Sequence, residues 1–164
     1  MSLTDDRNFA VSGSDEAAAF AAGGLSPGTA DHVLMNPPFN ALRNPSPDPG
    51  RRAAHAASDD TLPRWLRAAA WLLCASGVLT LIWRADGLGD VLAALSPQFG
   101  AITIVPVHPK PGSPAIRILV RGIKDRNGPL ILLPGLILAG TDGKPSQEAE
   151  AILRDGAALV LPFR

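Results

Sequence analysis

Cysteine is almost absent from this chain. Its 164 residues include one, Cys74, so an internal disulfide framework is excluded and a reducing cytoplasm is favoured. The uncharged apolar stretch of residues 68–83 falls short of the roughly 20 apolar residues of a membrane-spanning helix. The first nine residues carry Asp5, Asp6 and Arg7 with no apolar run, which excludes a signal peptide. We therefore expect a cytoplasmic protein that has no membrane partner.

Metal-ligand clusters and nucleophile motifs are missing too. His32, His55 and His108 are scattered without ligand spacing, and no cysteine pair accompanies them, so no metal site is expected. Cys74 lies among leucines of an expected helix, which indicates buried packing rather than a reactive thiol. No Gly-x-Ser-x-Gly sequence is present, so a serine-hydrolase elbow is not predicted.

The chain also carries no formal net charge, because 15 basic residues balance 15 acidic ones. The charges are nevertheless segregated along the chain. Residues 1–31 hold five acids and one base, a net of −4, and residues 105–126 hold five bases and one acid, a net of +4. The second segment is either a basic surface that meets phosphate or a solvated hairpin with ordinary surface charges. Charge alone leaves both interpretations open.

The chain is rich in apolar and turn-forming residues. Hydrophobic residues make up 46% of it, and glycine and proline number 16 each, which is typical of a globular domain rather than a helical bundle or a disordered chain. We expect one domain over residues 1–164. It divides into a loop-rich lead-in (1–30), an α/β core (31–125) and a C-terminal extension (126–164).

Hydrophobic periodicity predicts alternating strands and helices in that core. A proline- and charge-rich loop is expected over residues 40–60, a length typical of functional or disordered loops. The strand–helix–strand–helix order, followed by two strands joined by a tight loop, indicates an α/β fold. The expected strands are 31–35, 78–83, 102–107 and 115–123, with an apolar run at 130–138, and the expected helices are 61–76, 88–95 and 147–154.

The most specific sequence motif is Asn36-Pro37-Pro38-Phe39, at the end of the first expected strand. The Asn36 side-chain amide and the Pro37 carbonyl can each accept one N–H hydrogen bond, which would orient an amino or amide nitrogen toward an electrophilic methyl group. Two successive prolines hold these acceptors rigidly. Phe39 offers a flat face for a base removed from its stack. The alternative is a strand that simply ends at a Pro-Pro turn, but the surrounding strand–helix–strand context favours the functional interpretation.

Residues 31–40 resemble the motif strand of class I methyltransferases with an Asn-Pro-Pro-aromatic signature. The similarity is greatest to the bacterial tRNA1(Val) adenine-37 N6-methyltransferase group and its "small-domain" relatives, and it covers roughly residues 31–125. Segments 52–55, 65–69, 77–82, 108–111 and 115–120 also resemble that group. The resemblance implies the C-terminal portion of a Rossmann-like sheet, mostly parallel with an antiparallel edge hairpin. It also implies S-adenosyl-L-methionine as cofactor and Asn36, Pro37, Pro38 and Phe39 as the catalytic residues around the target adenine.

The expected acceptor is RNA, most specifically tRNA. Basic and histidine residues would contact it, and these are Arg43, Arg51, Arg52, His55, Lys110 and Arg117. Glutamine-N5 and rRNA guanine-N2 methyltransferases share the Asn-Pro-Pro motif and remain alternative functions. Phe39 in place of tyrosine, together with the basic loop, favours a nucleobase. A non-catalytic remnant or an RNA-binding fragment is the third alternative.

The family's glycine-rich cofactor loop is not found before Asn36. Only 35 residues precede that position, so we expect a chain without its cofactor-binding half, inactive alone and self-associating through an exposed sheet edge. Gly87-Leu88-Gly89 follows a strand as a nucleotide loop would, but Leu92 occupies the third glycine position. These glycines are therefore expected only to begin a helix.

Overall fold

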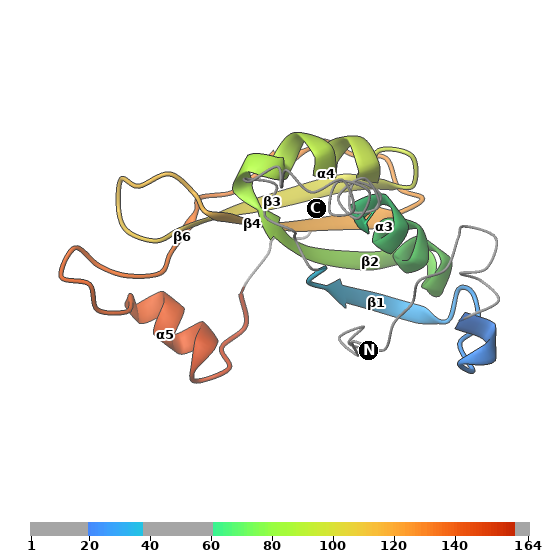
Figure 1. Ribbon diagram of the computed structural model, residues 1–164, viewed down its shortest axis with the longest axis horizontal. Coiled ribbons are helices and arrows are strands. Elements are labelled where there is room, and N and C mark those ends of the chain that lie inside the picture. Colours follow the sequence, from blue (N-terminus) through green and yellow to red (C-terminus); the bar gives the residue numbers. More distant parts are fainter. Residues whose placement is uncertain (1–19, 38–60, 160–164) are drawn as a thin grey trace, which may run out of the picture.

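A mixed six-stranded sheet runs through the part of the chain that this computed structural model describes, residues 20–37 and 61–159 (Figure 1). Its strands follow the order β1-β2-β4-β3-β5, and β6 pairs with β3 beside β5. The strands are β1 (Ala30–Met35), β2 (Leu73–Arg84), β3 (Phe99–His108), β4 (Arg117–Lys124), β5 (Ile131–Leu132) and β6 (Leu136–Ile137). The helices are α3 (Thr61–Leu72), α4 (Leu88–Leu95) and α5 (Gln147–Leu153), with a 3-10 turn, η1 (Ala85–Gly87), after β2.

The strand directions confirm the expected fold class. β1 pairs parallel with β2, and β5 and β6 pair parallel with β3. β4 is antiparallel to both of its neighbours, β2 and β3. The expected antiparallel hairpin is therefore β3–β4, with β4 inserted between β2 and β3. Two-residue strands β5 and β6 extend the sheet past that hairpin.

Helix α3 is shorter than its sequence pattern predicts. Leu62, Leu66 and Ala69 recur at helical spacing and are buried, but the helix ends at Leu72 rather than at residue 76. Leu73 begins β2 and pairs with Ala30 of β1. Leu73 is buried although it belongs to a strand. A buried residue at this position also fits helical periodicity, so the pattern could not show that Leu73 pairs with a strand.

Cys74 is consequently a strand residue and is half-buried, which corrects the expectation of a buried helical cysteine. The first part of β2 is irregular, because Ser76 has a positive φ of 62° and the register with β1 shifts between Ala30 and His32. Regular pairing begins with His32 and Val78, where the sequence pattern places the start of the strand.

Later elements agree more closely with the sequence. Helix α4 has the predicted bounds. The apolar run at 130–138 is split around Pro134 and Gly135 into β5 and β6, since proline cannot donate to a sheet ladder. Helix α5 begins after Ser146, whose Oγ accepts a 3.1 Å hydrogen bond from the Ala149 backbone N–H, a capping contact typical of helix starts.

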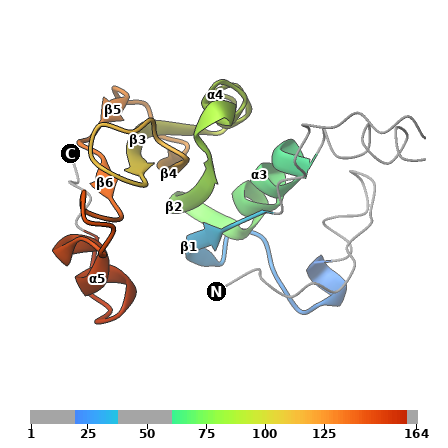
Figure 2. The same cartoon turned by 60° about the vertical axis from the view of Figure 1, so that its left-hand side comes forward.

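Two apolar cores lie on opposite faces of the sheet. Helices α3 and α4 cover one face, whereas α5 lies on the other side, near β6 (Figure 2). The larger core joins buried strand residues such as Leu81, Ile104 and Val120 to both of the covering helices. The smaller core has Val105, Val107 and Leu136 at its centre. Its partly buried members are Leu119, Leu133, Leu138 and Ile152.

Strand β1 is the end of the sheet in the described residues, where it pairs with β2 alone. Leu34 in this strand is 58% exposed. Self-association through this edge stays a prediction. Among residues 20–37 and 61–159, no helix is long and apolar enough to cross a bilayer, and no three or more His, Cys, Asp or Glu side chains group as metal ligands would.

Candidate functional site

Asn36 lies just past the end of β1, between two buried residues. Met35 is 1% exposed and Pro37 is fully buried, whereas Asn36 between them is exposed. This alternation continues that of the strand, so Asn36 and Leu34 lie on the same face of the sheet. Because proline fixes its own φ angle and restricts the residue before it, buried Pro37 limits the conformations of Asn36. The Asn36 side-chain amide and the Pro37 carbonyl thus lie on a restricted backbone at the point where β1 ends.

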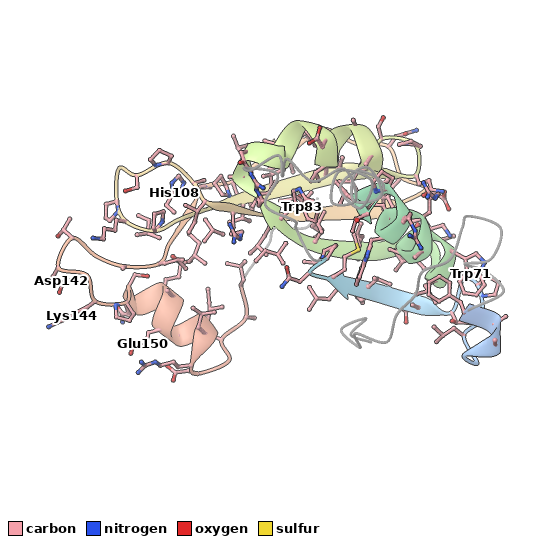
Figure 3. The ribbon with its side chains drawn as sticks, viewed as in Figure 1. Trp71, Trp83, His108, Asp142, Lys144 and Glu150 are labelled. Carbon is pink, nitrogen blue, oxygen red and sulfur yellow. The ribbon has the colours of Figure 1, made fainter. Side chains whose placement is uncertain are left out.

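This end of the sheet, where β1, β2 and β3 finish and β4 begins, is called the carboxyl edge below. Open α/β sheets bind their ligands outside the carboxyl ends of parallel strands. Figure 3 shows Trp83 and His108 toward the carboxyl edge and Trp71 toward the opposite end. Asn36, Arg84, His108 and Arg117 all lie at strand ends on the carboxyl edge.

Strand β2 contributes Trp83 and Arg84 to this edge. The two residues alternate across the sheet, and Trp83 packs against the larger core. Gly87 is required here, because a Cβ at that position would lie 2.7 Å from Trp83 Nε1. Arg84 forms an ion pair with Asp86: its Nε donates to Asp86 Oδ1 at 2.8 Å and its Nη2 donates to Oδ2. The Asp86 carboxylate raises the pKa of Arg84, so the guanidinium stays charged.

The β3–β4 connection is held by His108. Its Nδ1 lies 2.7 Å from the Ser113 carbonyl oxygen, and since a carbonyl can only accept, Nδ1 carries the proton. The ring packs against Gly135, where a Cβ would lie 2.4 Å from His108 Cδ2. Lys110 is exposed in this fixed loop. Arg117 begins β4 and donates a 2.9 Å hydrogen bond to the Ile116 carbonyl.

Four of the predicted site residues are described, and all four lie at the carboxyl edge or in the loop beyond it: Asn36, Pro37, Lys110 and Arg117. The other six lie outside the described residues, namely Pro38, Phe39, Arg43, Arg51, Arg52 and His55. The sequence motifs do not single out Arg84 and Asp86, which form an ion pair at this edge. The sequence signal for these two residues was a single charged residue at the end of an uncharged strand, followed by an acidic residue in the next turn.

The basic segment 105–126 is not one exposed surface. Arg121 is only 7% exposed, and its burial lowers the pKa of the guanidinium. Its cross-strand neighbours are Thr80 and Thr103, and Thr103 is itself buried. Lys124 donates a 2.7 Å hydrogen bond to the Leu73 carbonyl at the opposite end of the sheet. The expectation that the basic residues of segment 105–126 are exposed, on a basic surface or a solvated hairpin, is therefore wrong at Arg121, because this face is covered there.

Gly87 and Gly89 do not form a cradle for a nucleotide cofactor. Gly87 accommodates the Trp83 indole, and a Cβ added at Gly89 would meet nothing within 4 Å. Gly89 lies within α4 rather than in a loop before it. These residues begin a helix, as the sequence predicts. The described residues do not fit adenosylmethionine at this place.

Comparison with solved structures relates the whole arrangement to known proteins. A structure described as a predicted O-methyltransferase from Agrobacterium tumefaciens matches with a TM-score of 0.68 and 27% sequence identity. The alignment covers 85% of this chain and 58% of that one. The fold is methyltransferase-like. The chain therefore spans little more than half the length of this methyltransferase neighbour.

A second comparison is weaker. A putative DNA modification methylase from Thermus thermophilus matches with a TM-score of 0.48 and 18% identity, covering 85% of this chain and 58% of that one. This likeness is too distant to carry an argument. No protein-family model matches the chain, and no curated protein does.

Proposed function

We propose that this chain holds the methyl acceptor in an adenosylmethionine-dependent N-methyltransferase that acts on adenine N6 in RNA, most specifically tRNA. One observation carries the proposal: Asn36 is exposed between buried Met35 and fully buried Pro37, at the carboxyl edge of a methyltransferase-like sheet. The strand thus presents a fixed amide where such sheets bind ligands.

The acceptor nitrogen of adenine carries two N–H groups. The Asn36 side-chain oxygen accepts one, and the Pro37 carbonyl accepts the other, which orients the lone pair of the nitrogen away from both acceptors. Each hydrogen bond also increases electron density on the nitrogen. Adenosylmethionine supplies an activated methyl group, so positioning accounts for most of what the protein must add. Gly87 and Gly89 form no cradle for that donor, and the part proposed for Asn36 and Pro37 is to hold the acceptor.

RNA is the acceptor that the charges support best. Lys110 is exposed in the loop beyond the carboxyl edge, and Arg117 lies on that edge. Arg43, Arg51 and Arg52 of the predicted loop would add to these phosphate contacts. Phe39 would stack on the target base. Glutamine and the guanine N2 amino group also present two N–H groups, so Asn36 and Pro37 alone would accept either of them.

Transfer to oxygen is the second candidate, because the Agrobacterium neighbour is described as a predicted O-methyltransferase. A hydroxyl group has one hydrogen to donate, so it would leave one of the two acceptors at Asn36 and Pro37 unused. An amino group satisfies both. The chemistry of this strand end therefore favours nitrogen over oxygen.

The proposal is tested by identifying the product. The natural protein, purified from its source, is incubated with labelled adenosylmethionine and with tRNA, rRNA or protein from cells that lack it. We expect N6-methyladenosine in tRNA digests, and little transfer to tRNA from cells that keep the protein, because those sites are already methylated. Label in N2-methylguanosine, glutamine or an O-methyl group would refute the adenine acceptor. No transfer to any of these would refute the enzyme.

A further inference from the structure

The β3–β4 loop, residues 109–116, projects past the carboxyl edge (Figure 1). Its tip is a β-turn in which the Ser113 backbone N–H donates to the Lys110 carbonyl at 3.2 Å. The central residues of this turn are Pro111 and Gly112, and Gly112 has a φ of 72°, a combination typical of a type II turn. Because proline fixes its own φ angle, the turn has few alternative conformations.

His108 closes this loop at its base, where β3 ends (Figure 3). Its Nδ1 donates to the Ser113 carbonyl at 2.7 Å, so the ring joins the start of the loop to the far side of the turn. On its other side the ring lies against Gly135, where a Cβ would come within 2.4 Å of Cδ2 and 2.5 Å of Nε2. The imidazole is therefore fixed between the returning part of the loop and the backbone of the C-terminal extension.

The C-terminal extension also supports the outgoing part of the loop. The Leu138 backbone N–H donates to the His108 carbonyl at 2.8 Å, and the Ala139 N–H donates to the Pro109 carbonyl at 3.1 Å. These bonds follow directly on the pairing of β6 with the end of β3. Residues 135–139 therefore hold the loop from one side while His108 ties it from within.

Such a support is more than the connection itself requires. A hairpin needs only two to five residues to join its strands, and this loop has eight. Its single charged residue is Lys110, which begins the turn and is exposed. Ordering a mobile loop on binding costs free energy, and a loop that is already ordered avoids that cost. The arrangement thus suits an ammonium group that must meet an anion at a set place.

We propose that His108 is a positioning residue that holds Lys110 on one phosphate of the polynucleotide whose target base Asn36 binds. The inference rests on the proposed function. It adds His108 to the acceptor site and gives residues 135–139 the part of supporting the loop. A lysine at a fixed place beyond the carboxyl edge sets the distance between the phosphate and the flipped base. This contact carries no sequence information, so it sets register rather than base identity.

The test measures binding of a fluorescein-labelled, single-stranded RNA oligomer to the full chain by anisotropy, over a series of salt concentrations. Lys110→Gln should weaken binding about tenfold and reduce the slope of log K against log salt by about 0.7, because one phosphate contact is lost. His108→Leu should weaken binding about fivefold, the cost of ordering the loop. Its slope should stay at the wild-type value, since Lys110 still reaches the phosphate.

The double variant separates positioning from a general structural role. If His108 acts through Lys110, His108→Leu should change the affinity by less than about twofold when Lys110→Gln is already present. A fivefold loss in both backgrounds would overturn the proposal. His108→Asn, whose side-chain amide keeps a donor near the place of Nδ1–H, should bind within about twofold of wild type. Binding as weak as that of His108→Leu would contradict the role of the Ser113 contact.

Gly112→Val opens the loop without touching the core and replaces His108→Leu if that variant does not fold. A Cβ at Gly112 would meet nothing within 4 Å, but a β-branched residue is strained at this positive φ. Its loss of affinity should likewise disappear in the Lys110→Gln background. Equal losses in both backgrounds would again refute the positioning of Lys110.

Arg126→Gln is the matched control. Arg126 belongs to the same basic segment as Lys110 and is also exposed, but it follows β4 at the opposite end of the sheet. Its RNA affinity and salt slope should stay within about twofold and 0.2 of the wild-type values, since distant exposed charges are screened. If wild type binds RNA and Lys110→Gln behaves like this control, the loop contact is refuted and the proposed function stands. If wild type binds no RNA, the RNA acceptor itself is refuted.

Discussion

The two ends of the sheet differ in how their polar groups are used. At the amino edge, where β1, β2 and β3 begin and β4 ends, polar side chains bind neighbouring segments. Cys74 Sγ donates to Asp31 Oδ1 at 3.5 Å, and Lys124 Nζ donates to the Leu73 carbonyl at 2.7 Å. At the carboxyl edge, Asn36 is exposed and two arginines lie side by side. The amino edge joins elements of the fold, and we propose that the carboxyl edge presents Asn36 to a ligand.

The two ends of β1 differ in the same way. Asp31 at its amino end contacts Cys74 of β2. Asn36 just past its carboxyl end is exposed while the residues on either side of it are buried. Because the ends of parallel strands with one polarity meet at one edge, segments distant in sequence converge on the carboxyl edge. Substitutions at the amino edge should therefore change stability or thiol chemistry, and those at the carboxyl edge should change function.

The largest effect at the amino edge is expected for Lys124→Met. It removes the bond to the Leu73 carbonyl and leaves a part-buried acceptor without this donor. We expect a loss of about 1.5–3 kcal/mol in the free energy of unfolding, the range for hydrogen bonds to charged groups. Urea denaturation followed by circular dichroism measures it.

Lys144→Met is the control for that variant, since it also removes one positive charge, from an exposed loop residue. It should change the stability by no more than about 0.5 kcal/mol. Both variants should bind RNA equally well. Equal stability losses, or weaker RNA binding by Lys124→Met alone, would contradict the assignment of the amino edge to structure.

A smaller effect is expected at Cys74. Burial and the neighbouring Asp31 carboxylate raise the pKa of this thiol, because both disfavour the negatively charged thiolate. Less thiolate is then present at any given pH, and the rate of iodoacetamide alkylation should reach its midpoint at a higher pH than in the urea-unfolded chain. Asp31→Asn should move that midpoint back toward lower pH. A folded-state midpoint at or below the unfolded one would show that this contact does not form.

Much of the fold could be predicted from the sequence, but the boundary between α3 and β2 could not. Residues 88–95 follow Gly87 and match α4 at both ends. The sequence predicts an end for α3 that is too late, because buried residues at Leu72 and Leu73 fit the pattern of a helix as well as that of a strand. Pairing of Leu73 with Ala30 decides between them, and such pairing depends on a distant segment. Tertiary contacts override local preference here.

The candidate site divides in a similar way. Asn36 could be predicted because its chemistry is contained in four consecutive residues, Asn36-Pro37-Pro38-Phe39. Arg84 could not, since it is a single charge at the end of an apolar strand. Its place opposite Arg117 comes from the β2–β4 register, and no local pattern encodes the insertion of β4 beside β2. Arg121 shows the converse, because the charge pattern of residues 105–126 predicts an exposed side chain and the structure buries it.

The most direct test compares substitutions at the two ends of β1. Methyl transfer to RNA by the natural protein should fall about 100-fold in Asn36→Ala, because a misplaced acceptor nitrogen costs roughly that factor. RNA retention by this variant should persist within about twofold, since phosphate contacts supply most of the affinity. Asp31→Ala should leave the rate within about twofold of wild type. Equal losses in the two variants, or loss of RNA retention in step with activity in Asn36→Ala, would contradict the account.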